Sequence, residues 1–131
     1  MPALAICVSC IATPGLVSMT SNISHTNQQI NSIVPNQDMS PFFMYYTMQD
    51  KSETIKTMGL GGTATVNLNT GDFARIRVLV PDILTMRTYH EMVMPLMDRI
   101  LTNTRETMNL SNIRDSLLPK LMSGEILVNL Q

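Results

Sequence analysis

The sequence has no tryptophan, only two cysteines and few charged residues, and each shortage argues against a class of protein. Charged residues make up 15% of the 131 residues, whereas roughly a quarter is usual in globular domains. With nine basic and ten acidic residues, the chain lacks the basic excess of a dedicated nucleic-acid binder. No apolar run approaches the ~20 residues of a membrane span, and the apolar opening lacks the positive charges of a signal peptide. We therefore expect a cytoplasmic protein without a membrane segment.

Methionine is abundant, with twelve copies, and hydrophobic residues make up 44% of the chain. This composition favours a packed core and partner contacts over a disordered chain. Metal capture by methionine sulfur is the alternative, but the methionines follow helical spacing instead of forming clusters. We expect one small domain, or a small domain with an appended element.

Three short stretches in the first third of the chain alternate between apolar and polar residues, as β-strands do. In the third stretch we expect Ile30 and Val34 on one face of the strand and Gln29, Asn31 and Ile33 on the other. One face of the first stretch consists of Ile6, Val8 and Cys10. The expected strands cover residues 4–13, 15–21 and 28–35.

A helix is expected to begin after Ser40 and to run to about Met58. Ser40 is a suitable N-cap, and Pro41 fits the first helical position because its missing N–H is not needed there. Gly59 is the expected C-terminal cap, with Lys56 in the last turn. The residues expected to face inward are Met44, Met48, Ile55 and Met58.

The stretch "ARIRVLVP" has the clearest strand pattern in the chain. Alternation places Arg75 and Arg77 together on one face. The residues expected to face inward are Ile76, Val78 and Val80.

Helical patterns fill the rest of the chain. Asp82 can cap a short helix, and Pro95 is expected to interrupt the hydrogen-bond ladder and begin a second, longer helix that Gly124 closes. Pro119 is expected to kink or end that helix near its end. The expected fold class is α+β: a body of short strands with one helix (1–81), a connecting helix (82–94), a long coiled-coil-type helix (95–124) and a tail (125–131).

The long helix carries an apolar stripe whose members recur at intervals of three and four, with polar residues in the middle. Soluble monomers rarely expose a stripe of this length, so we expect it to pair with a similar helix on another chain or on a second copy. The alternative is that the helix folds back on the body, with Pro95 as the corner. The expected pairing residues are Leu96, Ile100, Asn103, Leu110, Ile113, Leu117 and Leu121.

Cys7 and Cys10 have the spacing of zinc ligands and redox motifs. In a strand, residues three apart point to opposite faces, so the two sulfurs would not share a metal. A zinc site needs further ligands, and His25 and His90 each stand alone. A cysteine nucleophile paired with His25 is the alternative, and it has no local support. We expect two buried thiols, with no metal and no cofactor in this chain.

The glycines of "GLGGTATVN" are compatible with a phosphate-binding turn, because they can expose backbone N–H groups. A P-loop, however, needs Gly-Lys-Ser/Thr leading into a helix, and no lysine follows here. A dinucleotide turn requires a preceding strand, whereas a helix is expected before these glycines. The loop is either a plain connection or a contact for a nucleic-acid backbone.

Polar groups that can contact nucleic acid occur in three places. The loop "SNISHTNQQ" offers uncharged donors and acceptors for base edges, the glycine-rich loop offers hydroxyl groups, and the last expected strand offers two cations. For each place the alternative is a solvated surface. The candidate residues are Asn22, Ser24, His25, Asn27, Gln28, Thr63, Thr65, Arg75 and Arg77.

Four stretches resemble one known family, in the same order along almost the whole chain. "MPLMDRILTNTRETMNL" followed by "IRDSLLPKLMSGEI" is similar to the signature helix that closes the specificity subunit of type I restriction–modification systems. Upstream, "VSCIATPGLV", "HTNQQINSIVP" and "GGTATVNLNTGDFARIRVLVP" resemble parts of that family's target-recognition domain.

The resemblance implies a target-recognition domain followed by a long helix. A full subunit of this family carries two such units, whose helices pair antiparallel as a spacer, and each domain reads one half of a split double-stranded DNA site. Methyltransferase subunits bind the helices and domains, restriction subunits bind around them, and the specificity subunit catalyses nothing. Beside the pairing residues, Arg114, Asp115 and Lys120 would then lie on the methyltransferase-facing side.

The chain departs from the family in length, since it holds one helix and part of one recognition domain. Our first hypothesis is a non-enzymatic DNA-specificity module that docks a methyltransferase. The alternative is a truncated assembly fragment that pairs through its helix, with a methyltransferase or a second copy, and no longer reads DNA. A third hypothesis, a small cysteine enzyme, predicts an activity lost on replacing Cys7 or Cys10.

Overall fold

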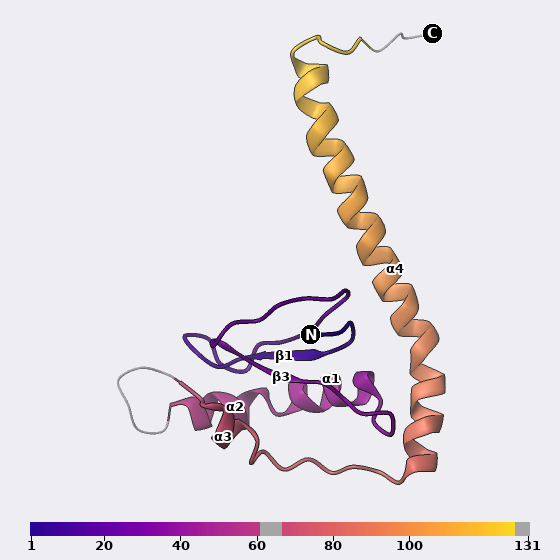
Figure 1. The fold of residues 1–131 in the computed structure, drawn as a ribbon. Coiled ribbons are helices and arrows are strands. Elements are labelled where there is room, and N and C mark those ends of the chain that lie inside the picture. Colours follow the sequence, from indigo (N-terminus) through magenta and orange to yellow (C-terminus); the bar gives the residue numbers. More distant parts are fainter. Residues whose placement is uncertain (61–66, 128–131) are drawn as a thin grey trace. The chain divides into compact units, whose positions relative to one another are not determined.

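The computed structural model describes residues 1–60 and 67–127. It confirms the α+β class: a three-stranded antiparallel sheet with short helices is followed by one long helix, α4 (Figure 1). The chain divides into two compact units, Met1–Met94 and Pro95–Gln131. None of the described helices is both long enough and apolar enough to cross a bilayer.

All three expected strands form, each shorter than its sequence pattern. They are β1 (Ile6–Ser9), β2 (Val17–Met19) and β3 (Ile30–Ile33). β1 lies in the middle and pairs antiparallel with both neighbours, in the order β2-β1-β3. The turn after β1 contains Gly15 with φ +88°, where a Cβ would lie 2.6 Å from the carbonyl oxygen of Ser52. Only glycine fits a backbone that is both left-handed and this closely approached.

The core lies on one face of the sheet. Ile6 and Val8 of β1 and Cys10 just after it point into the core, which confirms the expected face of the first stretch. Met44, Met48 and Ile55 cover them from the helices, as expected. Burial of these apolar side chains is the main term that stabilises the unit.

The expected grouping of the third strand is confirmed, with Asn31 and Ile33 on one face and Ile30 on the other. The pattern did not show which of the two faces is buried. Asn31 is opposite Val8 and Ile33 is opposite Ile6, so both point toward the core, while Val34 is 56% exposed. Asn31 can be buried because its amide is satisfied: its nitrogen donates to the Leu68 carbonyl (3.1 Å) and its oxygen accepts from the Thr70 hydroxyl (2.8 Å). A hydrogen-bonded polar group breaks the apolar alternation without a large desolvation cost.

The single helix expected up to Met58 is two helices, α1 (Pro41–Asp50) and α2 (Ser52–Gly59). The Ser40 cap is confirmed, since its hydroxyl accepts from the Phe43 N–H at 3.5 Å. The helices part at Lys51, and the Ser52 hydroxyl that begins α2 donates to the Gly15 carbonyl at 2.8 Å. This tertiary contact across 37 residues explains a break that the local pattern does not contain.

The C-cap of α2 also differs from the expectation. Gly59 is the last helical residue, and Leu60 is the C-cap with φ −81°. The helix therefore ends without the left-handed residue that favours glycine. Gly59 itself is buried in the last turn of α2.

The strand expected over residues 74–81 does not form. A short helix, α3 (Thr70–Phe73), ends just before it in a turn at Ala74 and Arg75, and residues 76–81 pair with no strand in the part of the chain that the structure describes. Ile76 and Val78 pack against the core as expected, whereas Val80 is 53% exposed. Alternating burial of side chains is enough to produce the apolar–polar pattern of residues 74–81. A β-strand also needs hydrogen bonds to a neighbouring strand, and the pattern does not record whether one is present.

One helix, α4 (Ile83–Met122), replaces the two helices expected on either side of Pro95. Each internal proline removes one N–H donor at a cost of roughly 3 kcal/mol, but the ladder continues on both sides of Pro95 and Pro119. Asp82 caps the helix as expected: its Oδ1 accepts from the N–H groups of Leu84 and Thr85, both at 3.0 Å.

The helix ends as predicted, with a left-handed Gly124 at φ +75° two residues past its last turn. The Ser123 N–H donates to the Pro119 carbonyl at 2.9 Å, which satisfies one of the last free carbonyl groups.

Candidate nucleic-acid interface

The polar loop of residues 20–29 connects the two outer strands of the sheet. Because β2 and β3 are both antiparallel to β1, this loop must run the length of β1 to reach the start of β3. It is tied to the first residues of the chain: the N-terminal amine of Met1 donates to the Ser24 carbonyl at 2.9 Å, and the Ser24 N–H returns a bond to the Met1 carbonyl at 3.1 Å. The loop therefore has a defined backbone on which polar side chains can be presented.

The five loop candidates divide by what their side chains do. The Ser24 hydroxyl donates to the Asn22 carbonyl at 3.0 Å, and the Asn27 side-chain oxygen accepts from the Gln29 N–H at 3.0 Å, so both groups shape the loop itself. Within the described residues, the exposed side chains of Asn22, His25 and Gln28 make no hydrogen bond. These three retain the full donor and acceptor capacity that base-edge contacts require.

The loop also carries an apolar side chain that the candidate set missed, since Ile23 is 85% exposed. Apolar side chains contact the thymine methyl group in the major groove. The sequence alone does not predict that Ile23 is exposed, because the residues around it have no apolar pattern with the spacing of a strand or a helix.

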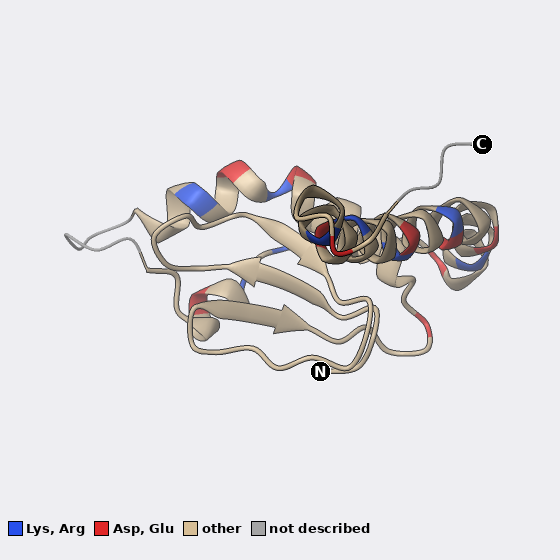
Figure 2. Cartoon of the chain, turned by 90° about the horizontal axis from the view of Figure 1, so that it is seen from above, with Lys and Arg blue, Asp and Glu red and all other residues tan. Residues whose placement is uncertain are grey.

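The sheet and its connections are uncharged. No Lys, Arg, Asp or Glu occurs between residues 1 and 37, and Figure 2 shows the coloured charges on the helices and on the segments that join them. A contact through this part of the chain would therefore read neutral base edges, and phosphate attraction would have to come from elsewhere.

The two candidate cations lie after α3, and not on a strand as expected. Arg75 follows α3 directly, and its guanidinium pairs with the Asp72 carboxylate at 3.1 Å. Arg77 is exposed and has no ion pair among the residues that the structure describes. Arg77 is thus the better candidate for a phosphate contact, because its charge is not already neutralised.

Thr63 and Thr65 lie outside the described residues, but the segments that flank them are held firmly. The Asn67 N–H donates to the Gly59 carbonyl at 3.2 Å, and Asn67 forms an isolated β-bridge with Ile11. The buried Asn31 then fixes the next residues through its bonds to Leu68 and Thr70. The sequence pattern does not predict this role, because an asparagine within a strand pattern is typical of a surface residue.

The two cysteines are buried free thiols. Cys10 points into the core, where the Asn31 amide lies 2.8 Å from its sulfur, whereas Cys7 belongs to the opposite face of β1. Among residues 1–60 and 67–127, no three His, Cys, Asp or Glu side chains gather as a metal site.

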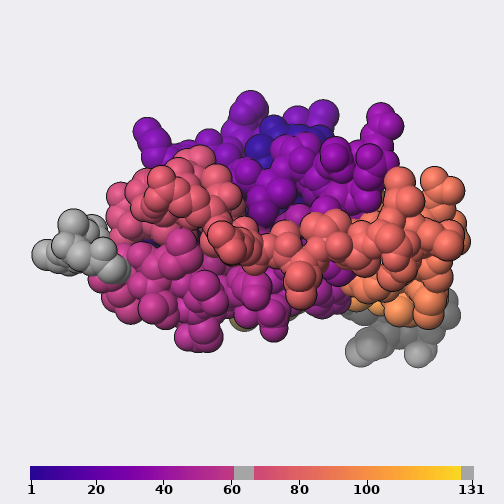
Figure 3. Space-filling model, turned by 90° about the horizontal axis from the view of Figure 1, so that it is seen from below, coloured from indigo at the N-terminus to yellow at the C-terminus, as the bar shows by residue number. Residues whose placement is uncertain are grey.

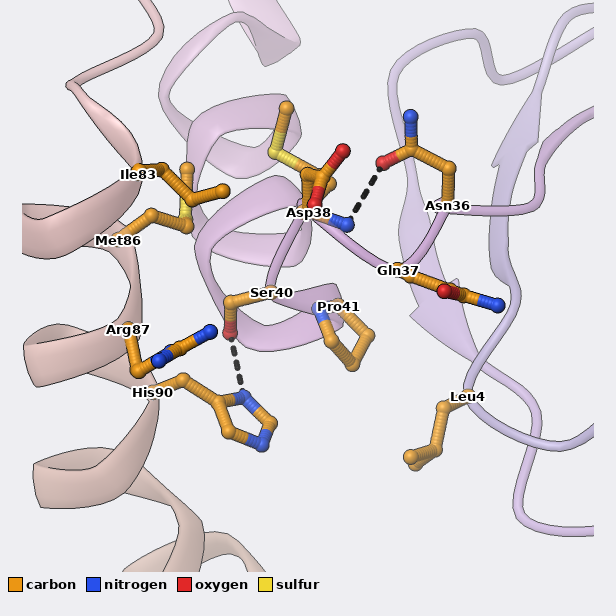
Figure 4. A pocket seen from close by; sticks show the side chains of 11 residues that line it. Leu4, Asn36, Gln37, Asp38, Ser40, Pro41, Ile83, Met86, Arg87 and His90 are labelled. Carbon is orange, nitrogen blue, oxygen red and sulfur yellow. Dashed lines mark hydrogen bonds between the residues drawn. The ribbon is translucent and has the colours of Figure 1, made fainter.

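A pocket of about 380 Å³ lies where the first turns of α4 pack against the start of α1 (Figure 4). His90 closes one side of it: its Nδ1 lies 3.0 Å from the Ser40 hydroxyl, and its ring stacks on Phe42 with centroids 5.4 Å apart. Arg87 and Asp38 add charges of opposite sign to the lining. His90 therefore joins the N-cap of α1 to α4, which the sequence analysis treated only as an isolated histidine.

The expected partner-binding residues all lie on α4. The unit Pro95–Gln131 contains the part of α4 that follows Met94, and among its described residues, 95–127, no second helix or strand is present to cover an apolar stripe. Arg114 pairs with Asp115 at 2.7 Å and Lys120 pairs with Glu125 at 3.7 Å, all with exposed side chains. The exposed apolar members of the stripe are Leu96, Ile100, Leu110, Ile113, Leu117 and Leu121.

Comparison with known proteins assigns this arrangement to a family. Residues 1–94 match the family described as "Type I restriction modification DNA specificity domain", and this range coincides with the first compact unit. The chain is 48% identical over 128 residues to the type I restriction enzyme HindI specificity subunit of Haemophilus influenzae, a match that covers 96% of this chain and 28% of that protein.

A second relative is the type I restriction enzyme MjaIX specificity subunit of Methanocaldococcus jannaschii. It is 36% identical over 87 residues, which cover 66% of this chain and 20% of that protein. The chain therefore spans between a fifth and three tenths of the length of these two relatives. The match to the family covers the whole sheet and the helices that pack on it, and on this ground the chain belongs to the type I restriction–modification DNA specificity family.

Proposed function

We propose that this chain is a DNA sequence-specificity module of a type I restriction–modification enzyme. It directs a methyltransferase subunit, and through it a restriction subunit, to a split double-stranded DNA site. The observation that carries the proposal is that the family match coincides with the compact unit that presents the uncharged loop of residues 20–29. In this proposal the chain holds no cofactor and performs no catalysis, so the methyl transfer takes place on the partner.

Base reading is assigned to the loop. Asn22, His25 and Gln28 keep free polar groups on a tethered backbone, and amide side chains bond bidentately to adenine edges. Arg77 contributes a phosphate contact, and the glycine-rich loop with Thr63 and Thr65 contributes hydroxyl groups. The partner-binding role belongs to α4.

The proposal is tested with the complex of the full chain and its methyltransferase, in a gel-shift assay against random duplex DNA. We expect a sequence-selective shift whose affinity falls with salt. If roughly four phosphates are neutralised, the slope of log affinity against log salt is about −3.6. A shift without sequence preference, or without any salt dependence, would contradict the proposal.

A matched pair of variants locates the reading surface. Replacing Asn22, His25 and Gln28 together by alanine should remove the selectivity but leave the non-specific shift, since each good base contact contributes roughly 1–3 kcal/mol of discrimination. Gln37→Ala, another exposed amide outside the loop, is the control and should bind as the wild type does. Methyltransferase association with no selectivity in the wild-type chain would favour the alternative, an assembly fragment that no longer reads DNA.

A further inference from the structure

One buried junction connects the loop of residues 20–29 to the segment that carries Arg77. Its centre is Cys10, which follows β1 and makes main-chain hydrogen bonds to two different segments. The Cys10 N–H donates to the Gln29 carbonyl at 2.9 Å, and the Cys10 carbonyl accepts from the Leu68 N–H at 3.0 Å. Gln29 is the last residue of the loop, and Leu68 lies just before α3. Two segments far apart in the sequence are therefore bonded to the same residue.

The side chain of Asn31 completes this junction. Its amide nitrogen donates to the Leu68 carbonyl at 3.1 Å and lies 2.8 Å from the Cys10 sulfur, and its amide oxygen accepts from the Thr70 hydroxyl at 2.8 Å. Asn31 is only 7% exposed, so little water competes for these bonds. Thr70, by contrast, is an exposed residue and begins α3. A surface residue is thus bonded to the sheet, across 39 positions of sequence, through one buried amide.

The segment after α3 carries the position of Thr70 forward to Arg77. The Ile76 N–H donates to the Phe73 carbonyl at 3.1 Å, in the turn that follows α3. Ile76 and Val78 then pack against the core on either side of Arg77. Apolar packing is non-directional, so it holds these two side chains against the core without fixing how far along it they lie. The hydrogen bond of Thr70 supplies that fixed point.

Arg77 itself remains accessible to a ligand. In Figure 3, the stretch from α3 to the start of α4 lies at the surface of the first unit, between the N-terminal residues and the helices α1 and α2. Arg77 is exposed on this stretch. A bond at Thr70 can therefore set where an exposed cation is presented.

We propose that the hydrogen bond between Thr70 and Asn31 is a positioning contact for DNA reading, which sets the span between the base-reading loop and the phosphate contact of Arg77. The inference rests on the proposed function, in which Gln28 reads a base edge and Arg77 contacts a phosphate. Phosphate contacts fix the register of a protein on the duplex. The base and phosphate contacts form together only if the span between Gln28 and Arg77 is constant.

The alternative is that the bond between Thr70 and Asn31 only stabilises the fold. The two roles differ in the salt dependence that they predict. A loss of stability does not change how many phosphates the folded complex neutralises, whereas a displaced Arg77 neutralises one phosphate fewer on the specific site. The slope of log affinity against log salt therefore separates a positioning role from a structural one.

The test compares Thr70→Val with the wild type, each as the full chain in complex with its methyltransferase. Gel shifts use a duplex that the wild-type complex selects from a random pool, and a scrambled duplex of the same composition. We expect Thr70→Val to bind the selected duplex about fivefold more weakly and the scrambled duplex within about twofold of the wild type. On the selected duplex, the salt slope should become shallower by about 0.9, which corresponds to one phosphate.

A second threonine provides the matched control. Thr57 is also exposed, and its hydroxyl donates to the Glu53 carbonyl at 2.9 Å, but it belongs to α2 and not to the junction. Thr57→Val should keep the wild-type slope, as should Thr70→Ser, which retains the hydroxyl. Arg77→Ala should reproduce the shallower slope. Combined with Thr70→Val it should change the slope no further, because both variants remove the same contact.

Circular dichroism checks that each variant folds, and Thr70→Ala removes the same hydroxyl if Thr70→Val does not. An unchanged slope on the selected duplex, an equal change in Thr57→Val, or a further change in the double variant with Arg77→Ala would each overturn this inference and leave the proposed function in place. A wild-type complex without sequence selectivity would overturn the proposed function, and this inference with it.

Discussion

The two units of this chain use the same kinds of apolar residue in opposite ways. In Met1–Met94, isoleucine, methionine and phenylalanine side chains from the sheet and the short helices are buried against one another. In Pro95–Gln131, the leucine and isoleucine side chains of the apolar stripe recur along α4 and stay between 40% and 65% exposed. A sheet with helices on one face can bury its own apolar surface, whereas the described residues of the second unit offer no other helix or strand for α4 to pack against.

The two units therefore differ in what stabilises them. The first unit derives its stability from its own core, and the helix of the second derives most of its stability from whatever covers it, since isolated helices gain little from propensity alone. Variants of matched chemistry in the two units should therefore behave differently.

The largest effect is expected from a pair of isoleucine truncations. Ile55→Ala removes a fully buried side chain and should lower the free energy of unfolding by about 2–5 kcal/mol. Ile113→Ala, at a residue that is 53% exposed, should change it by less than about 0.5 kcal/mol. Denaturant titration at low protein concentration measures both. Equal losses would mean that the second unit has a core of its own.

The second effect concerns association and not folding. The double variant Leu110→Asp with Leu117→Asp places two charges on the apolar stripe. We expect it to bind the methyltransferase at least about tenfold more weakly than the wild type. If the helix also pairs with a second copy, the mass measured by light scattering should fall as well.

Met108→Asp with Asn112→Asp is the control for that variant. Each of these residues is two positions from Leu110, which places it nearly on the opposite side of the helix, so the same added charge should leave association unchanged. Equal weakening by both double variants would point to a general effect of charge.

A smaller loss is expected at the polar group in the core. Asn31→Leu leaves the Leu68 carbonyl and the Thr70 hydroxyl without their partner, and should lower the free energy of unfolding by roughly 1–3 kcal/mol. Asn22→Leu, at an exposed amide of the loop, should change stability by less than about 0.5 kcal/mol. A neutral Asn31→Leu would show that these groups find other partners.

The smallest effect is a pH dependence at the start of α4. Hydrogen bonds from the Thr85 N–H and hydroxyl, and from the Leu84 N–H, hold the pKa of Asp82 below its ordinary value of 3.8. The folded state therefore favours the carboxylate, so the capping contribution is complete above pH 3.8 and is lost as the pH falls through the lower pKa of the folded state.

Asp82→Asn should accordingly flatten the acid side of the stability–pH curve, and Thr85→Val should flatten it in part. Denaturant titrations in steps from pH 5 to about pH 2 compare the three chains. A curve that is unchanged in Asp82→Asn would contradict the cap.

Much of the local structure could be predicted because it depends on neighbours in the sequence. The positions of the three strands, the Ser40 and Asp82 caps and the left-handed Gly124 follow from short-range patterns, and all are present. The break at Lys51 could not be predicted, because it depends on a bond between Ser52 and Gly15.

The candidate site was predictable only as a set of residue types. The loop composition indicates polar groups for base contacts, but which of them stay free depends on the hydrogen bonds of Ser24 and Asn27. Likewise, the shared strand face expected for Arg75 and Arg77 required a neighbouring strand, and residues 1–60 and 67–127 supply none beside them.

The order of residues was enough to specify the family, the strand and helix segments and the apolar stripe of the last helix, since each of these depends on spacing along the chain. Packing in three dimensions decided which face of β3 meets the core, that residues 74–81 do not form a strand, and which polar groups stay available to a partner. The physical reason is that burial and hydrogen-bond pairing are set by residues far apart in the sequence, and no local period records which distant groups will meet.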